Sequence, residues 1–236
     1  MSPARYVGDG WRPLSLSKGP TVCESCGVNA YLDHAATTPL RAEARAAWID
    51  ASEIVGNASS IHGAGQDARR LLEDARDRLA TALGCEPIEV VFTSGGTESI
   101  NLALVGLLRA RRAATGRNLM VVPDGEHHAT LDTVRWLTSS GEAEVRWVPI
   151  DANARVDLAA WRAALADERA AVVTLLGANN EVGSLQPVAE ASAIAADAGV
   201  PLHIDAVGTF GHVPLSFHEL RADARGGALG RSASSS

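Results

Sequence analysis

The feature that most restricts the fold is a regular alternation of short apolar runs and longer amphipathic segments, which begins near residue 89. The short runs are rich in Val, Leu and Ala, and the segments between them repeat apolar residues at helical spacing. Strands separated by helices imply crossover connections and therefore a mainly parallel sheet. The expected strands are 89–93, 118–122, 144–149, 170–176 and 200–204, and the expected helices between them are 97–114, 128–140, 157–166 and 187–198. We therefore predict a three-layer α/β domain, with ligands bound beyond the carboxyl ends of the strands.

Two further helices are expected before this alternation, over residues 41–53 and 64–83. The second carries an apolar stripe with charged residues on its other side, and Gly84 ends it. The stripe consists of Ala68, Leu71, Leu72, Ala75, Leu79 and Leu83. Residues 1–29 show no hydrophobic period, so we expect a disordered extension there.

That extension contains Cys23 and Cys26 in the order C-E-S-C. Such a pair can be half of a zinc site or a redox pair, but zinc needs four ligands and no second pair follows. We interpret the two residues as ordinary thiols in a flexible segment.

Composition excludes several classes of function. Apolar residues make up 46% of the 236-residue chain, which is enough for a sizeable core. The net charge of −7 argues against nucleic acid as a partner, because phosphate binding favours a basic surface. No apolar run is long enough to span a membrane, and three cysteines suit a reducing compartment. We expect a cytoplasmic protein with neither nucleic acid nor membrane as its partner.

The segment VFTSGGTESINLAL, residues 91–104, places two glycines and several hydroxyls between an expected strand and an expected helix. One interpretation is a tight turn and no more. The other is an anion-binding turn, because backbone N–H groups at a helix N-terminus have no partner within the helix.

Polar residues follow three of the other expected strands as well: Glu126-His127-His128, Ala178-Asn179-Asn180-Glu181 and Asp205. Each has an ordinary structural interpretation: a solvated histidine, an Asx turn, a helix N-cap. Together with the Gly-Gly turn, they fit one ligand that has a phosphate, an aromatic ring, a phenolic oxygen and a basic ring nitrogen. That ligand is pyridoxal 5'-phosphate.

The chain also resembles a known family through six motifs that occur in order between Tyr31 and Asp223. They are YLDHAATT at 31–38, GNASSIH at 56–62, TSGGTES at 93–99, EHHATLD at 126–132, ANNEVG at 178–183 and HIDAV at 203–207. These resemble the cysteine desulfurases, pyridoxal-phosphate enzymes of the class V aminotransferase group. The resemblance implies conversion of L-cysteine to L-alanine, with the sulfur transferred as a persulfide for iron–sulfur cluster assembly.

The resemblance also implies roles for single residues. Gly96 and Thr97 match the phosphate-binding turn. His127 matches the histidine that stacks over the cofactor ring, and it is the one catalytic residue that the matched motifs supply. Asn180 matches the amide near the phenolic oxygen, and Asp205 the carboxylate that keeps the ring nitrogen protonated.

For substrate and partners, the resemblance implies that Asn57 lies on the substrate side of the site. It also implies L-cysteine as the substrate, a sulfur-acceptor or scaffold protein as a partner, and a homodimer. No metal is expected.

Three departures from the family argue against turnover. Gly208 stands where the family has a glutamine that contacts the phenolic oxygen. The lysine that forms the Schiff base is absent, since the only lysine, Lys18, lies before the matching region. The sulfur-accepting cysteine is absent too, and Cys85 is interpreted as structural. Arginine cannot replace the lysine, because it is not deprotonated in proteins.

We therefore expect an incomplete large domain over 30–224, an aberrant Gly- and Ser-rich tail over 225–236, and no C-terminal small domain. Binding of the cofactor is expected to be weak or absent. Two alternatives stay open from the sequence. One is another enzyme of the same group, such as a selenocysteine lyase or a transaminase. The other is a non-catalytic fragment that binds a partner protein.

Overall fold

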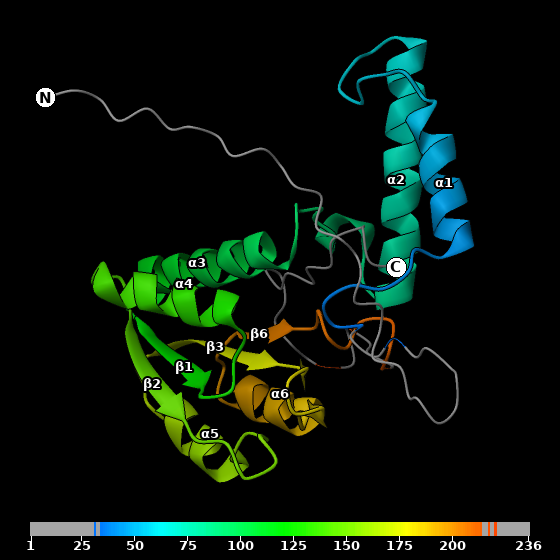
Figure 1. Ribbon diagram of the computed structural model, residues 1–236. Helices are drawn as coiled ribbons and strands as arrows, with labels where there is room; N and C mark the ends of the chain where they lie inside the picture. The colour runs from blue at the N-terminus through cyan, green and yellow to red at the C-terminus, as the bar shows by residue number, and fades with distance from the viewer. Residues whose placement is uncertain (1–30, 32–33, 214–216, 218–219, 221–236) are drawn as a thin grey trace, which may run out of the picture. The chain divides into compact units, whose positions relative to one another are not determined.

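The computed structural model describes residues 31, 34–213, 217 and 220, and Figure 1 gives its ribbon. The predicted extension at 1–29, with Cys23 and Cys26, and the predicted tail at 225–236 lie outside these residues. The chain divides between Thr38 and Pro39 into two units, and the second unit contains all the described helices and strands.

Four strands form a parallel sheet, as the alternating pattern predicts. In the order in which they lie side by side, they are β2 (Glu144–Val148), β1 (Leu119–Pro123), β3 (Ala170–Leu176) and β6 (Leu202–Asp205). β1 and β3 are buried along their whole lengths, which explains their nearly continuous apolar sequences.

Two helices cover each face of this sheet, so the predicted three-layer α/β architecture is confirmed (Figure 1). On one face, α3 (Gly96–Thr115) and α4 (His128–Ser139) pack against side chains such as Met120 and Val172. On the other, α5 (Leu158–Leu165) and α6 (Val188–Asp197) pack against Val173 and Leu175. Alternate residues of one strand thus enter different cores, because successive side chains point to opposite faces of a sheet.

Local chemistry sets the ends of these helices. The Asp157 side chain accepts hydrogen bonds from the amides of Ala159 and Ala160 and so caps the start of α5. α3 ends at Gly116, whose φ of 73° places it in the left-handed region that glycine tolerates best.

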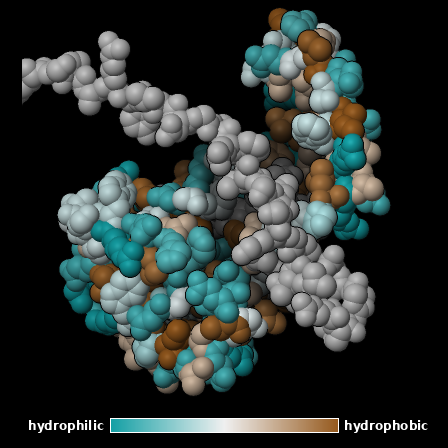
Figure 2. Space-filling view, in the orientation of Figure 1, coloured by the Kyte–Doolittle hydropathy of each residue, from teal (hydrophilic) through white to brown (hydrophobic). Residues whose placement is uncertain are grey.

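The two helices nearer the N-terminus are α1 (Ala42–Ser52) and α2 (Gly63–Leu83), in agreement with the sequence pattern. α1 has no buried residue, and the predicted stripe of α2 is buried only at its end: Leu71 and Leu72 are exposed, whereas Leu83 is buried. Apolar side chains therefore lie on the surface of these helices, where Figure 2 shows them in brown. Among the described residues, no helix has the length and apolarity to cross a bilayer.

The predicted strand at 89–93 is wrong. A short 3-10 helix, η1 (Pro87–Glu89), precedes this segment, and Val91 and Phe92 are exposed. Arg76 donates a hydrogen bond to the Val90 carbonyl, and its guanidinium lies 5.0 Å from the centre of the Phe92 ring. Within the described part of the chain no strand pairs with this run, and a strand is stable only as part of a ladder.

A second difference is a small antiparallel pair that periodicity does not predict. It joins β4 (Ala178–Asn179) to β5 (Ser184–Leu185) through a turn that contains Gly183, at φ 73°. The pair is too short to show an alternating pattern, so only its turn residues mark it in the sequence.

The α5/α6 core depends on Trp161, which has no exposed surface and donates a hydrogen bond from its indole nitrogen to the Ala191 carbonyl at 3.1 Å. We predict that Trp161→Ala lowers the free energy of unfolding by about 3–5 kcal/mol, because it leaves a cavity and removes a buried hydrogen bond. Trp136 is half exposed on α4, so Trp136→Ala is the control and should cost about 1 kcal/mol or less. Urea denaturation measures both, and equal losses would contradict the assignment.

Candidate functional site

The sheet has one point at which ligands bind in folds of this kind. From β1 the chain crosses to β2 on one side, and it later returns to β3 on the other side of β1. The connections that leave the carboxyl ends of β1 and β3 therefore run in opposite directions, and in open α/β sheets ligands bind at such a point. The loops that follow β1, β3 and β6 lie at this edge.

Three contacts connect these loops to each other. The Glu126 carboxylate oxygen Oε1, in the loop after β1, accepts a hydrogen bond from the Leu176 amide at 2.6 Å. The Asn179 side-chain nitrogen donates to the Gly125 carbonyl at 3.4 Å, and the Gly177 amide donates to the Asp205 carbonyl at 2.8 Å. Residues that are far apart in the sequence thus form one edge.

Asp205, at the end of β6, is the buried carboxylate of this edge, with 3% of its surface exposed. Its Oδ1 accepts the Val207 amide at 3.0 Å, so it also has the turn-capping role that is its ordinary structural interpretation. Burial raises the pKa of Asp205, and the nearby His127 opposes that shift. No arginine or lysine forms an ion pair with it among the described residues.

His127 is the N-cap residue of α4 and is exposed at the same edge. Its Nδ1 accepts the Ala129 amide at 3.2 Å, which places the ring proton of the neutral imidazole on Nε2. This cap contact orients the ring at the carboxyl edge of the sheet. His128 follows it, with the two ring centres 5.9 Å apart.

The two asparagines after β3 behave differently. Asn179 is a structural residue, since its Oδ1 accepts the amides of Glu181 and Val182 in an Asx turn. Asn180 is exposed, and its side chain has no hydrogen bond within the described residues. Gly208 lies against this loop, where an added Cβ would be 3.3 Å from the Ala178 carbonyl oxygen.

The Gly-Gly turn begins the 20-residue helix α3 without a side-chain cap. Ser94 donates from both its amide and its hydroxyl to Glu98, each at 2.6 Å. The amides of Gly96 and Thr97 have no hydrogen-bond acceptor in the described part of the chain, so they are available to an anion. No hydrogen bond among the described residues connects this turn to the other three loops.

Asn57 is not brought to the edge by any contact within the described residues. It is exposed before α2, and its side-chain oxygen accepts the Ser59 amide at 2.9 Å. Its expected place on the substrate side therefore stays a prediction.

A buried polar layer lies beneath the edge and is not predicted from the sequence, where Glu126 is a strand-end residue without an assigned role. Thr174 in β3 and His203 in β6 are paired in register, and the Thr174 hydroxyl lies 2.9 Å from the His203 Nδ1. Thr130 of α4 is also fully buried, and its hydroxyl lies near the Glu126 carboxyl. The available signal was a polar residue at a core position, such as Thr174 inside the apolar run AAVVTLL.

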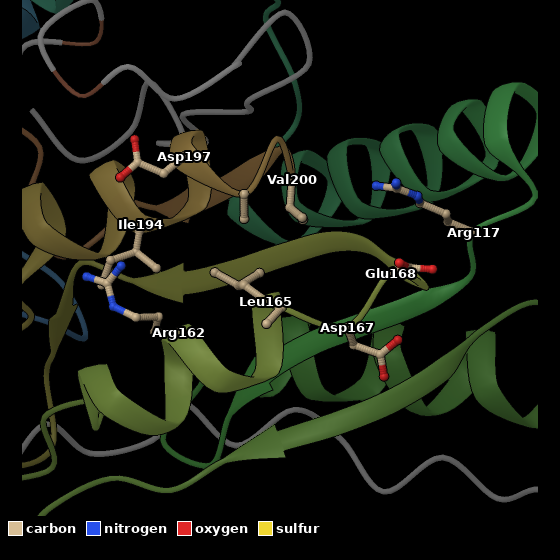
Figure 3. Close-up of a pocket in the computed structure, with 10 residues that line it drawn as sticks. Arg117, Arg162, Leu165, Asp167, Glu168, Ile194, Asp197 and Val200 are labelled. Atoms are coloured by element: carbon tan, nitrogen blue, oxygen red, sulfur yellow. The ribbon is translucent and has the colours of Figure 1, made fainter.

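Neither Cys85 nor the pocket drawn in Figure 3 belongs to this edge. Burial, Glu89 and Glu86 raise the pKa of the Cys85 thiol, which agrees with a structural role. A pocket of about 380 Å³ lies where β1, β3 and β6 begin, at the opposite edge of the sheet (Figure 3). Among the described residues, no group of three His, Cys, Asp or Glu side chains could hold a metal.

The buried His203 generates a prediction about pH. Burial lowers its pKa to about 4, so the unfolded chain binds a proton at higher pH than the folded chain does. Its stabilising effect is complete above about pH 6.5 and is lost as the pH falls towards 4. Between pH 7 and pH 4.5, wild type should lose about 2 kcal/mol more than His203→Asn, which keeps a group to meet Thr174. Urea denaturation at both pH values measures these losses, and an equal loss in the two proteins would contradict the prediction.

Known proteins resemble this chain in sequence and in fold. Residues 30–225 match the aminotransferase class-V family. An IscS-like cysteine desulfurase of Mycobacterium tuberculosis is 47% identical over 190 residues, which cover 80% of this chain and 48% of that protein. The cysteine desulfurase IscS of Dictyoglomus turgidum is 39% identical, with 82% and 48% covered.

Among solved structures, a NifS-like protein has a TM-score of 0.74 at 34% identity, with 80% of this chain and 51% of that one covered. A structure of SspA in complex with cysteine has a TM-score of 0.74 at 28% identity, with 82% and 55% covered. The chain thus spans about half the length of these relatives. The match over residues 30–225 shows that the chain belongs to the aminotransferase class-V family.

Proposed function

We propose that this chain is a cysteine desulfurase-like protein whose strand-end loops hold pyridoxal 5'-phosphate without a covalent bond. The observation that carries the proposal is the buried carboxylate of Asp205 at the end of β6, close to His127 in the loop after β1. The similar cysteine desulfurases support the choice of cofactor and reaction class.

The residues present fit the noncovalent part of such a site. A carboxylate buried without a cation is costly, and a protonated pyridine nitrogen beside Asp205 would supply the missing positive charge. At the start of α3, the amides of Gly96 and Thr97 offer a place for the phosphate. The covalent part of such a site is missing, because residues 31–236 contain no lysine to anchor the cofactor.

When bound, pyridoxal phosphate supplies an electron sink for a carbanion at the substrate Cα. The protein's own residues would prepare that chemistry. Asp205 would hold the proton on the ring nitrogen, and His127, fixed by its cap on α4, would lie against the ring face. Asn180 would donate its amide to the phenolic oxygen, a contact that Gly208 cannot make.

The substrate we propose is L-cysteine, with a sulfur-acceptor or scaffold protein as the partner for iron–sulfur cluster assembly. This 236-residue chain should not turn cysteine over, because residues 31–236 provide no amine to bind the cofactor or to move the Cα proton. Placed acid–base groups contribute about 10²–10⁴-fold to such reactions. The cytoplasmic location stays a prediction from the cysteine content.

Cofactor binding is the direct test. The chain should bind pyridoxal phosphate reversibly, and borohydride reduction should leave no pyridoxyl adduct within residues 31–236. Asp205→Asn should weaken binding about 10- to 100-fold, the value of a charge-assisted hydrogen bond. Asp132→Asn is the matched control, since Asp132 is exposed and pairs with Arg135, and it should bind like wild type. Absorbance titration measures binding, and an adduct in that region or equal affinities would reject the proposal.

We further propose that the chain forms a homodimer through α1, α2 and the segment between them. The support is apolar surface: Trp48 is 70% exposed, Val55 86% and Ile61 93%. Apolar side chains exposed to this extent favour association with another surface. The same surface supports the second candidate function, a non-catalytic fragment that binds a partner protein.

Sedimentation at increasing protein concentration tests this association. Wild type should form a species larger than the monomer, and the triple variant Trp48→Ser, Val55→Ser, Ile61→Ser should sediment as a monomer. Ile88→Ser is the control, because Ile88 is 90% exposed but lies on η1. A wild type that is monomeric at every concentration would contradict the proposal.

A further inference from the structure

Glu126 is a buried carboxyl group for which the proposed function has no use. Only 7% of the residue is exposed, although it directly precedes the exposed His127. Its Oε1 accepts the Leu176 amide at 2.6 Å, which joins the loop after β1 to the last residue of β3. Its Oε2 has no hydrogen-bond partner among the described residues.

The surroundings of Glu126 contain a second carboxyl group, and among the described residues no cation pairs with Glu126 there. Asp205 of β6 is close enough for its charge to act on Glu126. Hydroxyl groups of Thr130 on α4 and Thr174 on β3 lie near the carboxyl, and beyond Thr174 lies the buried, neutral His203. Two carboxylates buried side by side cannot both be ionised at low cost.

The neighbours decide which of the two groups carries the charge. Asp205 accepts the Val207 backbone amide, and the nearby His127 lowers its pKa. Glu126 has only the Leu176 amide and two hydroxyls, and burial raises its pKa to about 8. The neutral acid is therefore the form of Glu126 that this environment accepts.

We propose that Glu126 is a positioning residue that works as a neutral carboxylic acid: it fastens the His127 loop to the end of β3 and leaves Asp205 as the charged carboxylate. This role rests on the proposed function, in which Asp205 and His127 meet the cofactor. An ionised Glu126 would compete with Asp205 for the same positive charge and would weaken the preference for the ring nitrogen.

The charge state can be measured without any cofactor. In protein labelled with ¹³C at the glutamate carboxyl carbon, the resonance absent from Glu126→Gln belongs to Glu126. Its titration should have an inflection near pH 8, and an inflection near the ordinary 4.5 would overturn the proposal. The wild-type urea midpoint should also fall relative to that of Glu126→Gln between about pH 5 and about pH 8, because the folded chain binds the proton more tightly.

The positioning role needs a comparison of two variants. Glu126→Gln keeps a neutral acceptor for the Leu176 amide, whereas Glu126→Ala removes it. Hydrogen exchange at Leu176 should match wild type in the glutamine variant and be about tenfold faster in the alanine variant. Pyridoxal phosphate affinity should follow the same order, with the glutamine variant within about twofold of wild type and the alanine variant about tenfold weaker.

These results separate the two proposals. If wild type does not bind pyridoxal phosphate but Glu126 titrates near pH 8, the proposed function fails and the neutral acid stands. If the cofactor binds and Glu126→Gln weakens it as much as Glu126→Ala does, the role of the neutral acid is overturned.

Discussion

The parallel pairing of β1 with β3 is the contact on which the other features depend. Both strands are buried on both faces, so side chains of each enter the α3/α4 core and the α5/α6 core. Because β2 and β6 pair only with the outer sides of these two strands, their positions follow from the central pair. The chain turns to opposite sides of β1, which is the arrangement that places ligand sites at the carboxyl ends of such sheets.

The face of the sheet under α3 and α4 is divided along the strands. Toward their amino ends it is apolar, with residues such as Met120 and Val172, and toward their carboxyl ends Thr174, His203 and Asp205 replace them. Buried polar groups lower stability unless they are hydrogen-bonded. Their position directly beneath the loops of His127 and Asn180 indicates that this end of the core supports a site.

The helices could be predicted from their apolar period, and the four paired strands from the short apolar runs that alternate with those helices. The strand expected at 89–93 failed, since Val90 to Phe92 have the composition of a strand but periodicity does not show whether a partner lies beside them. The polar layer could not be predicted because burial, which alone makes Glu126 unusual, depends on β3 and β6. The positions of His127 and Asp205 could be predicted, because the carboxyl ends of parallel strands lie at the same edge of a sheet. The position of Asn57 could not, because its segment is not connected to a strand of the sheet.

The helical crossovers have a consequence for how the chain folds. Each ladder of the four-stranded sheet joins strands that are separated by at least one helix, so none can form as a local hairpin. The entropy of closing long loops must be lost before pairing is rewarded, and parallel sheets fold slowly for this reason. During that delay, Val-rich segments such as β1 and β3 are exposed to other copies. The rate of folding, as much as the final stability, therefore decides what fraction of the molecules folds before it aggregates.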